Sequence, residues 1–109
     1  QAARLSVTHT VHFTPEARDQ LDKLEADISG AASPAVAARY VDSIVDYCQN
    51  LQTFPHRGTR RDDLRPGLRT LGFRRRVTIL FEVAGDTVNI LGVYYGGQDY
   101  EADLTDDEE

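Results

Sequence analysis

Residues 68–95 constrain the fold more than any other stretch, because branched and aromatic side chains recur there at alternate positions. This alternation is the pattern of a β-strand with one buried face. A turn at Ala84-Gly85-Asp86 separates two such runs, so the stretch predicts an antiparallel hairpin. The expected inward face of the first run consists of Val77, Ile79, Phe81 and Val83.

The second run of this hairpin is predicted to place apolar groups on both faces of the sheet. Val88 and Ile90 continue the alternation of the first run. The apolar residues assigned to the opposite face are Leu91, Val93 and Tyr95, together with Leu80 of the first run. We therefore expect the sheet to be covered, at least in part, on both sides.

Two amphipathic helices are predicted before the hairpin, preceded by a strand over residues 5–13. Thr14-Pro15-Glu16 begins the first helix, because a capping hydroxyl, a proline in the first turn and an acid all favour a helix start. This helix is expected to end near Ile28, and Ser33-Pro34 begins the second by the same logic. The apolar stripe of the second helix consists of Ala37, Val41, Ile44, Cys48 and Leu51.

The predicted order of elements is β-α-α-β-β-β, which defines an α+β fold. A helical hairpin would pack on one face of a small, mainly antiparallel sheet. No repeat or linker interrupts the pattern, so we expect a single domain over residues 5–99. Residues 100–109 would form an acidic C-terminal tail, and residues 1–4 a processed or cloning-derived end.

Positive charge is concentrated in one part of an acidic chain. The net charge is −6, yet residues 57–76 contain eight arginines and two aspartates. The planar guanidinium suits carboxylates and phosphates, so the cluster predicts an anion-binding or protein-docking surface; pairing with nearby acids is the alternative. The residues that we assign to this surface are Arg60, Arg61, Arg65, Arg69, Arg74, Arg75, Arg76 and Tyr95.

The end of the sequence has the opposite charge. Residues 99–109 contain seven acidic residues and no basic one. A disordered, solubilising tail is the simpler expectation. The alternative is that this segment folds back on the arginines and screens them.

Few residues suit metal or nucleophilic chemistry. His9 and His12 point to opposite faces of the predicted strand, and Cys48 lies on an apolar helix stripe, where a thiol is expected to be structural. We therefore expect no metal and no cofactor. The single cysteine allows no internal disulfide and favours the cytoplasm, and no apolar run is long enough to span a membrane.

Four short segments follow one another in a distinctive order. They are Phe54-Pro55-His56-Arg57-Gly58, the run DDLRPGLR that ends at Arg69, Phe81-Glu82-Val83, and Ile90-Leu91-Gly92-Val93. Together with FTPEARDQL after the first strand and AARYVDSI in the second helix, they resemble the ParE branch of the ParE/RelE superfamily of bacterial toxins. The resemblance covers residues 5–99.

The resemblance implies a small toxin of a type II toxin–antitoxin module that acts by binding, without a catalytic centre of its own. Its expected partners are DNA gyrase, the target of the ParE branch, and a ParD-like antitoxin. The acidic C-terminal segment of the antitoxin would wrap the toxin. No membrane partner is expected, and no specific DNA binding by the toxin alone.

The RelE branch of the superfamily provides the alternative, a ribosome-dependent mRNA endoribonuclease. In that case Arg69, Arg76 and Tyr95 would form the catalytic site. Tyr95 stands where the family often has histidine, and Gly97 and Gln98 stand where arginines are common. These departures favour the gyrase-binding branch.

Overall fold

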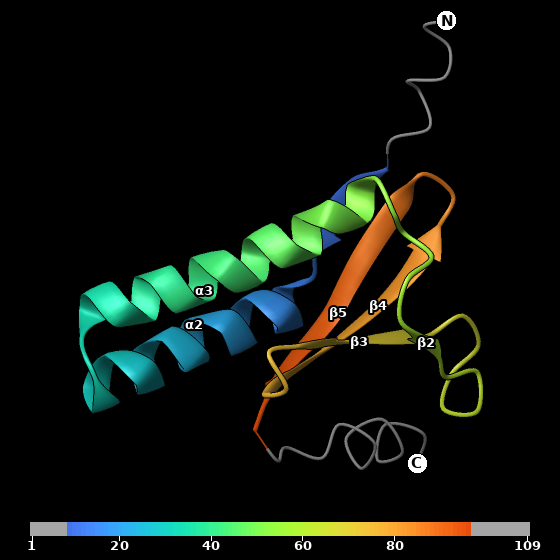
Figure 1. The fold of residues 1–109 in the computed structure, drawn as a ribbon. Coiled ribbons are helices and arrows are strands. Elements are labelled where there is room, and N and C mark those ends of the chain that lie inside the picture. Colours follow the sequence, from blue (N-terminus) through green and yellow to red (C-terminus); the bar gives the residue numbers. More distant parts are fainter. Residues whose placement is uncertain (1–8, 97–109) are drawn as a thin grey trace, which may run out of the picture.

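The computed structural model describes residues 9–96 of the chain (Figure 1). Its elements are β1 (Thr10–Phe13), α2 (Pro15–Ala31), α3 (Pro34–Gln49), the 3-10 turn η1 (Asn50–Gln52), β2 (Thr59–Arg60), β3 (Arg69–Phe73), β4 (Val77–Ala84) and β5 (Thr87–Tyr95). The beginning of the predicted first strand and the acidic tail lie outside the described residues. The predicted domain limits at residues 5 and 99 therefore stay predictions.

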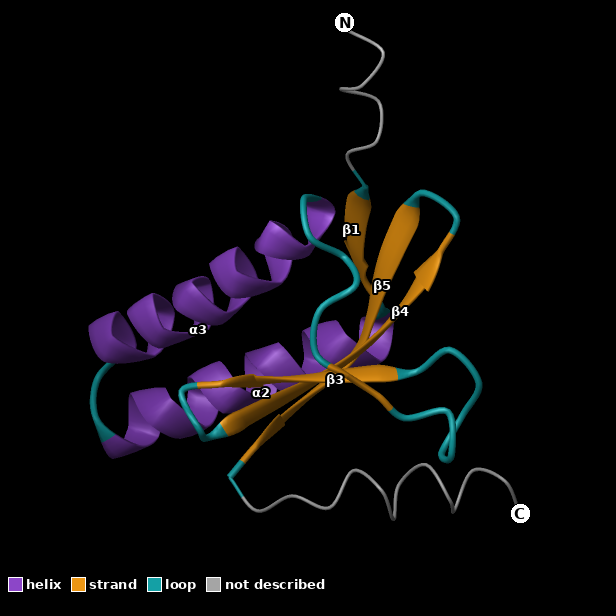
Figure 2. Cartoon of the chain, turned by 45° about the vertical axis from the view of Figure 1, so that its right-hand side comes forward, coloured by secondary structure: helices purple, strands orange, loops and turns teal. Residues whose placement is uncertain are grey.

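All strands belong to one mixed sheet in the order β1-β5-β4-β3-β2. β1 runs parallel to β5, and the other neighbours are antiparallel. α2 and α3 lie side by side on one face of this sheet, as Figure 1 and Figure 2 show from two directions. The predicted α+β fold is confirmed, with one addition. The short strand β2 has no counterpart in the predicted order of elements, and its two exposed residues are too few to produce an alternating pattern.

Each helix begins where the capping pattern predicts. The Thr14 and Ser33 hydroxyls each accept a hydrogen bond of 3.2 Å from the backbone N–H three residues later. α2 continues to Ala31, past its predicted end near Ile28. A glycine inside a helix costs only about 1 kcal/mol relative to alanine, so Gly30 is not enough to end the helix.

The core lies between the helical hairpin and the sheet. It consists of Ala17, Leu21, Leu24, Val41, Ile44, Cys48, Leu51, Leu71, Phe73, Val77, Ile79, Phe81, Val88, Ile90 and Val93. The predicted apolar stripe of α3 is buried throughout, and so is the predicted inward face of β4 except for the partly buried Val83. Among residues 9–96 no polar or charged side chain is buried, so apolar burial holds the layers together.

β5 contains a bulge that the sequence pattern does not reveal. The pairing of β4 with β5 shifts between Leu80 and Phe81, which leaves Leu91 as an extra residue on β5. An extra residue turns the side chains that follow it to the other face of the sheet. Val93 is therefore in the core and Tyr95 packs against it. The prediction that these two residues face away from Val88 and Ile90 is wrong for this reason.

Gly58 is expected to tolerate no side chain. Its φ is +81°, and a Cβ there would collide with the carbonyl oxygen of Thr70 in β3. Gly58→Ala should therefore cost the left-handed strain of about 1–2 kcal/mol and, in addition, the energy of displacing β3. Gly67→Ala is the matched control, because φ there is +83° and a Cβ would meet nothing within 4 Å. Urea unfolding should show the larger loss for Gly58→Ala, and equal losses would contradict the close approach.

Candidate functional site

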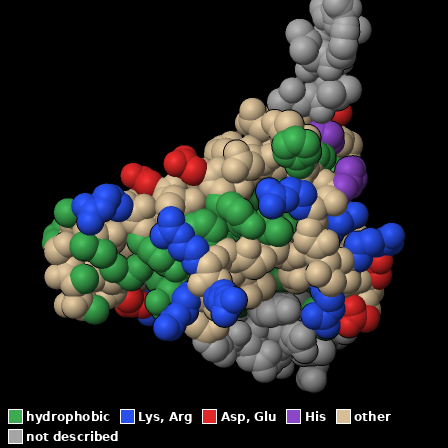
Figure 3. All heavy atoms as spheres, in the orientation of Figure 1, with side chains coloured by type: hydrophobic (Ala, Val, Ile, Leu, Met, Phe, Trp, Pro, Cys, Tyr) green, Lys and Arg blue, Asp and Glu red, His purple; other side chains and the backbone are tan. Residues whose placement is uncertain are grey.

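The arginines of residues 57–76 fall into two groups at opposite ends of β3. The loop arginines, around β2 and the start of β3, are Arg57, Arg60, Arg61, Arg65 and Arg69. The hairpin arginines, in the turn from β3 to β4, are Arg74, Arg75 and Arg76. Since β3 has five residues, roughly 13 Å of strand separates the groups. Figure 3 shows basic side chains interleaved with hydrophobic ones across one face of the molecule.

Two of the loop arginines are paired with acids of the same loop. Arg60 approaches the Asp62 carboxylate to 2.8 Å, and Arg61 donates to both oxygens of Asp63 at 3.0 and 2.9 Å. A hydrogen bond from the backbone N–H of Gly67 is the main cause that lowers the pKa of Asp62, and Arg60 adds to it. The hydrogen bond from Arg61 lowers the pKa of Asp63. For these two arginines, pairing with local acids is the arrangement that the structure shows.

Arg57 and Arg69 hold the start of β3 against α3. Arg69 donates to the backbone carbonyl of Arg57 at 3.3 Å. The Arg57 guanidinium in turn lies 5.6 Å from the centre of the Tyr47 ring on α3. The Tyr47 hydroxyl donates to the carbonyl of Gly72 in β3 at 3.0 Å. These contacts order both arginines without using an acid.

Arg65 is associated with the second face of the sheet. It lines a hollow of about 330 Å³ together with Thr14, Glu16, Gln20, Leu68, Leu80, Leu91 and Tyr94. Leu80 is buried there and Leu91 is half-buried. The expectation that both faces of the sheet are covered is thus confirmed in part. Tyr94 borders this hollow on the second face, away from the aromatic side chains that pack against the helices.

Two of the three hairpin arginines adopt a backbone conformation that is rare for arginine. Arg74 and Arg75 have φ values of +52° and +61°, and the N–H of Arg76 donates to the carbonyl of Phe73 at 3.2 Å. Two successive positive φ values define a type I′ turn, which glycine and asparagine favour. Each arginine costs about 1 kcal/mol in this position. Within the described chain, none of the hairpin arginines forms an ion pair.

A row of aromatic rings connects the two arginine groups. In order, the rings are Tyr95, Tyr40, Phe73 and Tyr47, with successive centroids 6.1, 6.3 and 4.8 Å apart. The Arg74 guanidinium lies 4.8 Å from the centre of the Phe73 ring and 5.9 Å from that of Tyr40. Burial raises the pKa of the Tyr40 hydroxyl and Tyr95 adds to this, whereas Arg74 and Arg76 act in the opposite direction. Tyr95 and the guanidinium of Arg74 therefore both lie against the Tyr40 ring.

Tyr40 and Tyr47 are site residues that the sequence did not identify as such. They are separated by about two turns of α3 and so project from one face of the helix. The spacing between the two tyrosines was a signal in the sequence for a shared surface, but it is equally typical of residues that belong to the apolar stripe of the helix. Their contact with arginines depends on where β3 lies, which no local pattern specifies.

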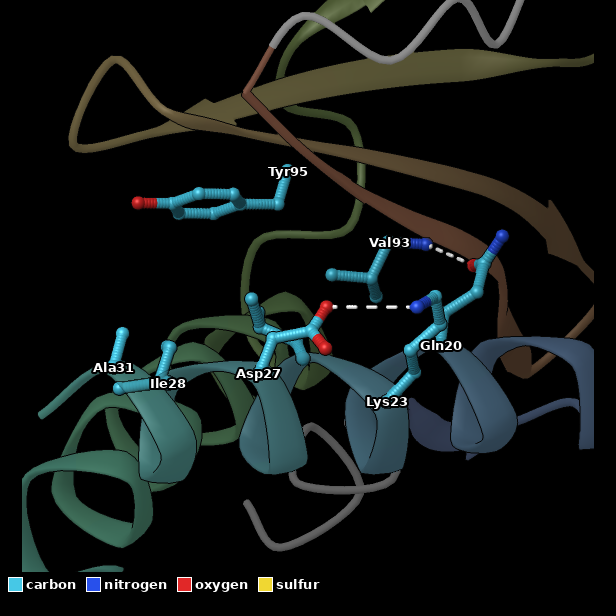
Figure 4. A pocket seen from close by; sticks show the side chains of 8 residues that line it. Gln20, Lys23, Asp27, Ile28, Ala31, Val93 and Tyr95 are labelled. Carbon is cyan, nitrogen blue, oxygen red and sulfur yellow. Dashed lines mark hydrogen bonds and ion pairs between the residues drawn. The ribbon is translucent and has the colours of Figure 1, made fainter. Parts of the chain in front are cut away.

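A groove of about 520 Å³ lies between α2 and the end of β5 (Figure 4). Its lining residues are Gln20, Lys23, Leu24, Asp27, Ile28, Ala31, Val93 and Tyr95. The side-chain oxygen of Gln20 accepts the N–H of Val93 at 2.6 Å, because β1 pairs only with the first half of β5. Lys23 and Asp27 form an exposed ion pair of 3.6 Å on α2. Tyr95 borders both the groove and the aromatic row.

The structure brings together two of the three residues considered for a catalytic site. Arg76 precedes Val77, which pairs with Tyr95. Arg69 pairs instead with Phe81, at the other end of β3 and roughly 13 Å along the strand. Arg76 and Tyr95 are thus neighbours, and Arg69 belongs to the other arginine group. A catalytic role for the three stays a prediction.

Other kinds of site have little support in the part of the chain that is described. Residues 9–96 hold no group of three His, Cys, Asp or Glu side chains placed to bind a metal ion. Cys48 is fully buried, and burial raises the pKa of its thiol to about 12. No described helix is long and apolar enough to cross a membrane.

Known proteins share this fold and sequence pattern. The family model for the ParE toxin of the type II toxin–antitoxin system parDE matches residues 11–100. Toxin ParE3 of Caulobacter vibrioides (strain ATCC 19089 / CIP 103742 / CB 15) is 32% identical over 84 residues, which cover 77% of this chain and 83% of that protein. A solved structure described as the chromosomal ParDE TA system from P. aeruginosa matches with a TM-score of 0.73 and 26% identity, covering 83% of this chain and 98% of the other.

The family match includes nearly every described element, from β1 to β5. The chain therefore belongs to the ParE toxin family. It is a ParE-like toxin of a type II toxin–antitoxin system, as the order of its motifs predicted.

Replacing Arg75 by glycine is expected to stabilise the fold. Glycine relieves a left-handed penalty of about 1–2 kcal/mol but makes the unfolded chain more flexible, at a cost of about 0.5–1 kcal/mol, so Arg75→Gly should raise the free energy of unfolding by about 0.5–1 kcal/mol. Arg76→Gly is the matched control, because Arg76 has no positive φ. Added flexibility there should lower the free energy by about 0.5–1 kcal/mol. Urea unfolding measures both, and equal losses would show that the turn is not strained.

Proposed function

We propose that this toxin inhibits DNA gyrase by protein binding and is neutralised by a cognate ParD-like antitoxin. The observation that carries the proposal is the surface formed by the hairpin arginines, the aromatic row and the adjacent groove. Arginine and tyrosine dominate the binding energy of protein interfaces, and an apolar groove beside them accepts anchoring side chains. Membership of the ParE family and the likeness to a ParDE system support the choice of partners.

The antitoxin would combine charge with apolar contact. Its acidic segment would form charge-assisted hydrogen bonds with the arginines, and its apolar anchors would enter the groove over Leu24, Ile28 and Ala31. The residues to which we assign antitoxin or target binding are Arg60, Arg61, Arg65, Arg69, Arg74, Arg75, Arg76 and Tyr95. We place the toxin in the cytoplasm, which its single cysteine favours.

A RelE-like ribosome-dependent endoribonuclease is the second candidate function. The neighbouring positions of Arg76 and Tyr95 favour it, because a guanidinium beside a hydroxyl suits the charge that develops on a phosphate. The distance of Arg69 from this pair disfavours it. Inhibition by binding alone does not require Arg69, Arg76 and Tyr95 to lie close together.

A supercoiling assay with purified gyrase, relaxed plasmid and ATP tests the proposal. The toxin should inhibit, and a stoichiometric amount of antitoxin should restore supercoiling. Reversing two charges in the Arg75→Glu, Arg76→Glu variant should weaken inhibition by about tenfold or more. Arg18→Glu is the matched control, because Arg18 is exposed in the first turn of α2 and belongs to neither arginine group.

Two outcomes would contradict inhibition of gyrase. One is unchanged supercoiling at a large molar excess of folded toxin. The other is cleavage of translated messages at codon-defined positions, detected by primer extension and lost in Tyr95→Phe, which would establish the endoribonuclease instead.

The antitoxin complex is expected to depend on salt and on Arg69. Arg69→Glu should raise the dissociation constant by about tenfold, because it places a carboxylate opposite an acidic segment. Raising the salt concentration from about 0.05 to 0.5 M should speed dissociation, since screening shortens the reach of exposed charges. Surface plasmon resonance measures both, with Arg18→Glu as the control. Equal dissociation constants at the two salt concentrations would rule out the electrostatic contribution.

A further inference from the structure

The groove between α2 and the end of β5 presents its charges in a fixed order. Among the described residues that line it, only Lys23 and Asp27 are charged. Both belong to α2, and four residues of helix place them about 6 Å apart along its axis. Figure 4 shows Lys23 toward the Val93 end of the groove and Asp27 toward the Tyr95 end. The charge along this rim therefore changes from positive to negative toward Tyr95.

Beyond Tyr95 the surface becomes positive again. The Tyr95 ring packs against the Tyr40 ring, with centroids 6.1 Å apart. The Arg74 guanidinium lies 5.9 Å from the centre of the same Tyr40 ring. Tyr95 also pairs with Val77, the residue that follows the hairpin arginines in the chain. A segment that lies in the groove and continues past Tyr95 therefore meets positive, negative and again positive charge.

We propose that this order of charges fixes the register in which the antitoxin lies in the groove. The bound segment places an acidic residue beside Lys23, a basic residue beside Asp27 and further acidic residues beside the hairpin arginines. Its apolar anchors lie between these charges, over Leu24 and Ile28. A shift of about one helical turn along the groove would bring like charges together, which is how an interface rejects a wrong arrangement or a wrong partner.

The fold itself does not require this order of charges. On a helix, a basic residue four positions before an acid is the less favourable orientation of such a pair. Lys23 and Asp27 leave 73% and 64% of their side-chain surfaces exposed, and their ion pair is 3.6 Å long. Because solvent screens a pair of this kind, either side chain can turn to a charge on a partner at little cost.

An exchange of the two charges tests the inference with the cognate antitoxin. Lys23→Asp, Asp27→Lys keeps the net charge and the pairing within α2 but reverses the order. Surface plasmon resonance in low salt should show a dissociation constant raised by about tenfold or more, because each charge then meets a like charge. The neutral variant Lys23→Gln, Asp27→Asn should raise it by only about two- to threefold, since attraction is lost without repulsion being added.

A second exchange on the same helix provides the matched control. Arg18 and Asp22 have the same spacing and the same order of charges, both are exposed, and neither lines the groove. Arg18→Asp, Asp22→Arg should therefore change the dissociation constant by less than about twofold. Urea unfolding should show both exchanged variants to be at least as stable as the unaltered toxin, because the reversed order suits a helix better. A loss of binding is thereby separated from a loss of folding.

The inference rests on the proposed binding of an antitoxin in the groove, and the two can fail separately. If the antitoxin binds the unaltered toxin, but the Lys23 and Asp27 exchange weakens it no more than the neutral variant or the control does, the inference is overturned and the proposed function stands. If the antitoxin does not bind the unaltered toxin, the proposed function is contradicted and the inference is overturned with it.

Discussion

The bulge at Leu91 determines which side chains at the end of β5 face the helices. After this bulge Val93 turns its side chain into the core and donates its N–H to Gln20 of α2. Gly92 allows the tight geometry, because a Cβ there would lie 2.7 Å from a neighbouring tyrosine ring. Tyr95 consequently faces the helices and forms a wall shared by the groove and the aromatic row. Without the bulge, alternation would turn Tyr95 away from both.

The two arginine groups are ordered by different interactions, and this affects how they can meet a partner. Arg60 and Arg61 are held by ion pairs with the exposed carboxylates of Asp62 and Asp63, and because solvent screens such pairs, a competing carboxylate can exchange with either aspartate at little cost. Arg74 is held by stacking on an aromatic ring, which orders the guanidinium while its polar edges stay available. The hairpin group can therefore bind an anion without first losing a charged contact within the described chain.

Local patterns predict most of the fold, because caps and alternation act over a few residues. Thr14 and Ser33 mark the helix starts, and the alternation in β4 identifies its buried face. The bulge at Leu91 cannot be read this way, since an inserted residue is defined only by the strand that it pairs with. For the same reason the arginines are recognisable as a cluster in sequence, yet their division by β3 is not. The contact of Tyr40 with the hairpin likewise needs the packing of α3 on the sheet.

The strained turn bears on whether the arginines are functional or only a consequence of composition. An arginine-rich composition places arginines most readily where they cost nothing, such as exposed helix positions. Arg74 and Arg75 instead occupy positive φ values that glycine or asparagine would adopt more easily. Glycine would relieve the strain but remove the stacked guanidinium of Arg74 and the charge of Arg75. Backbone strain of this kind is retained where the side chain is required for function and the accompanying loss of stability is tolerated. The turn is therefore the part of the arginine surface at which a role in binding is best supported.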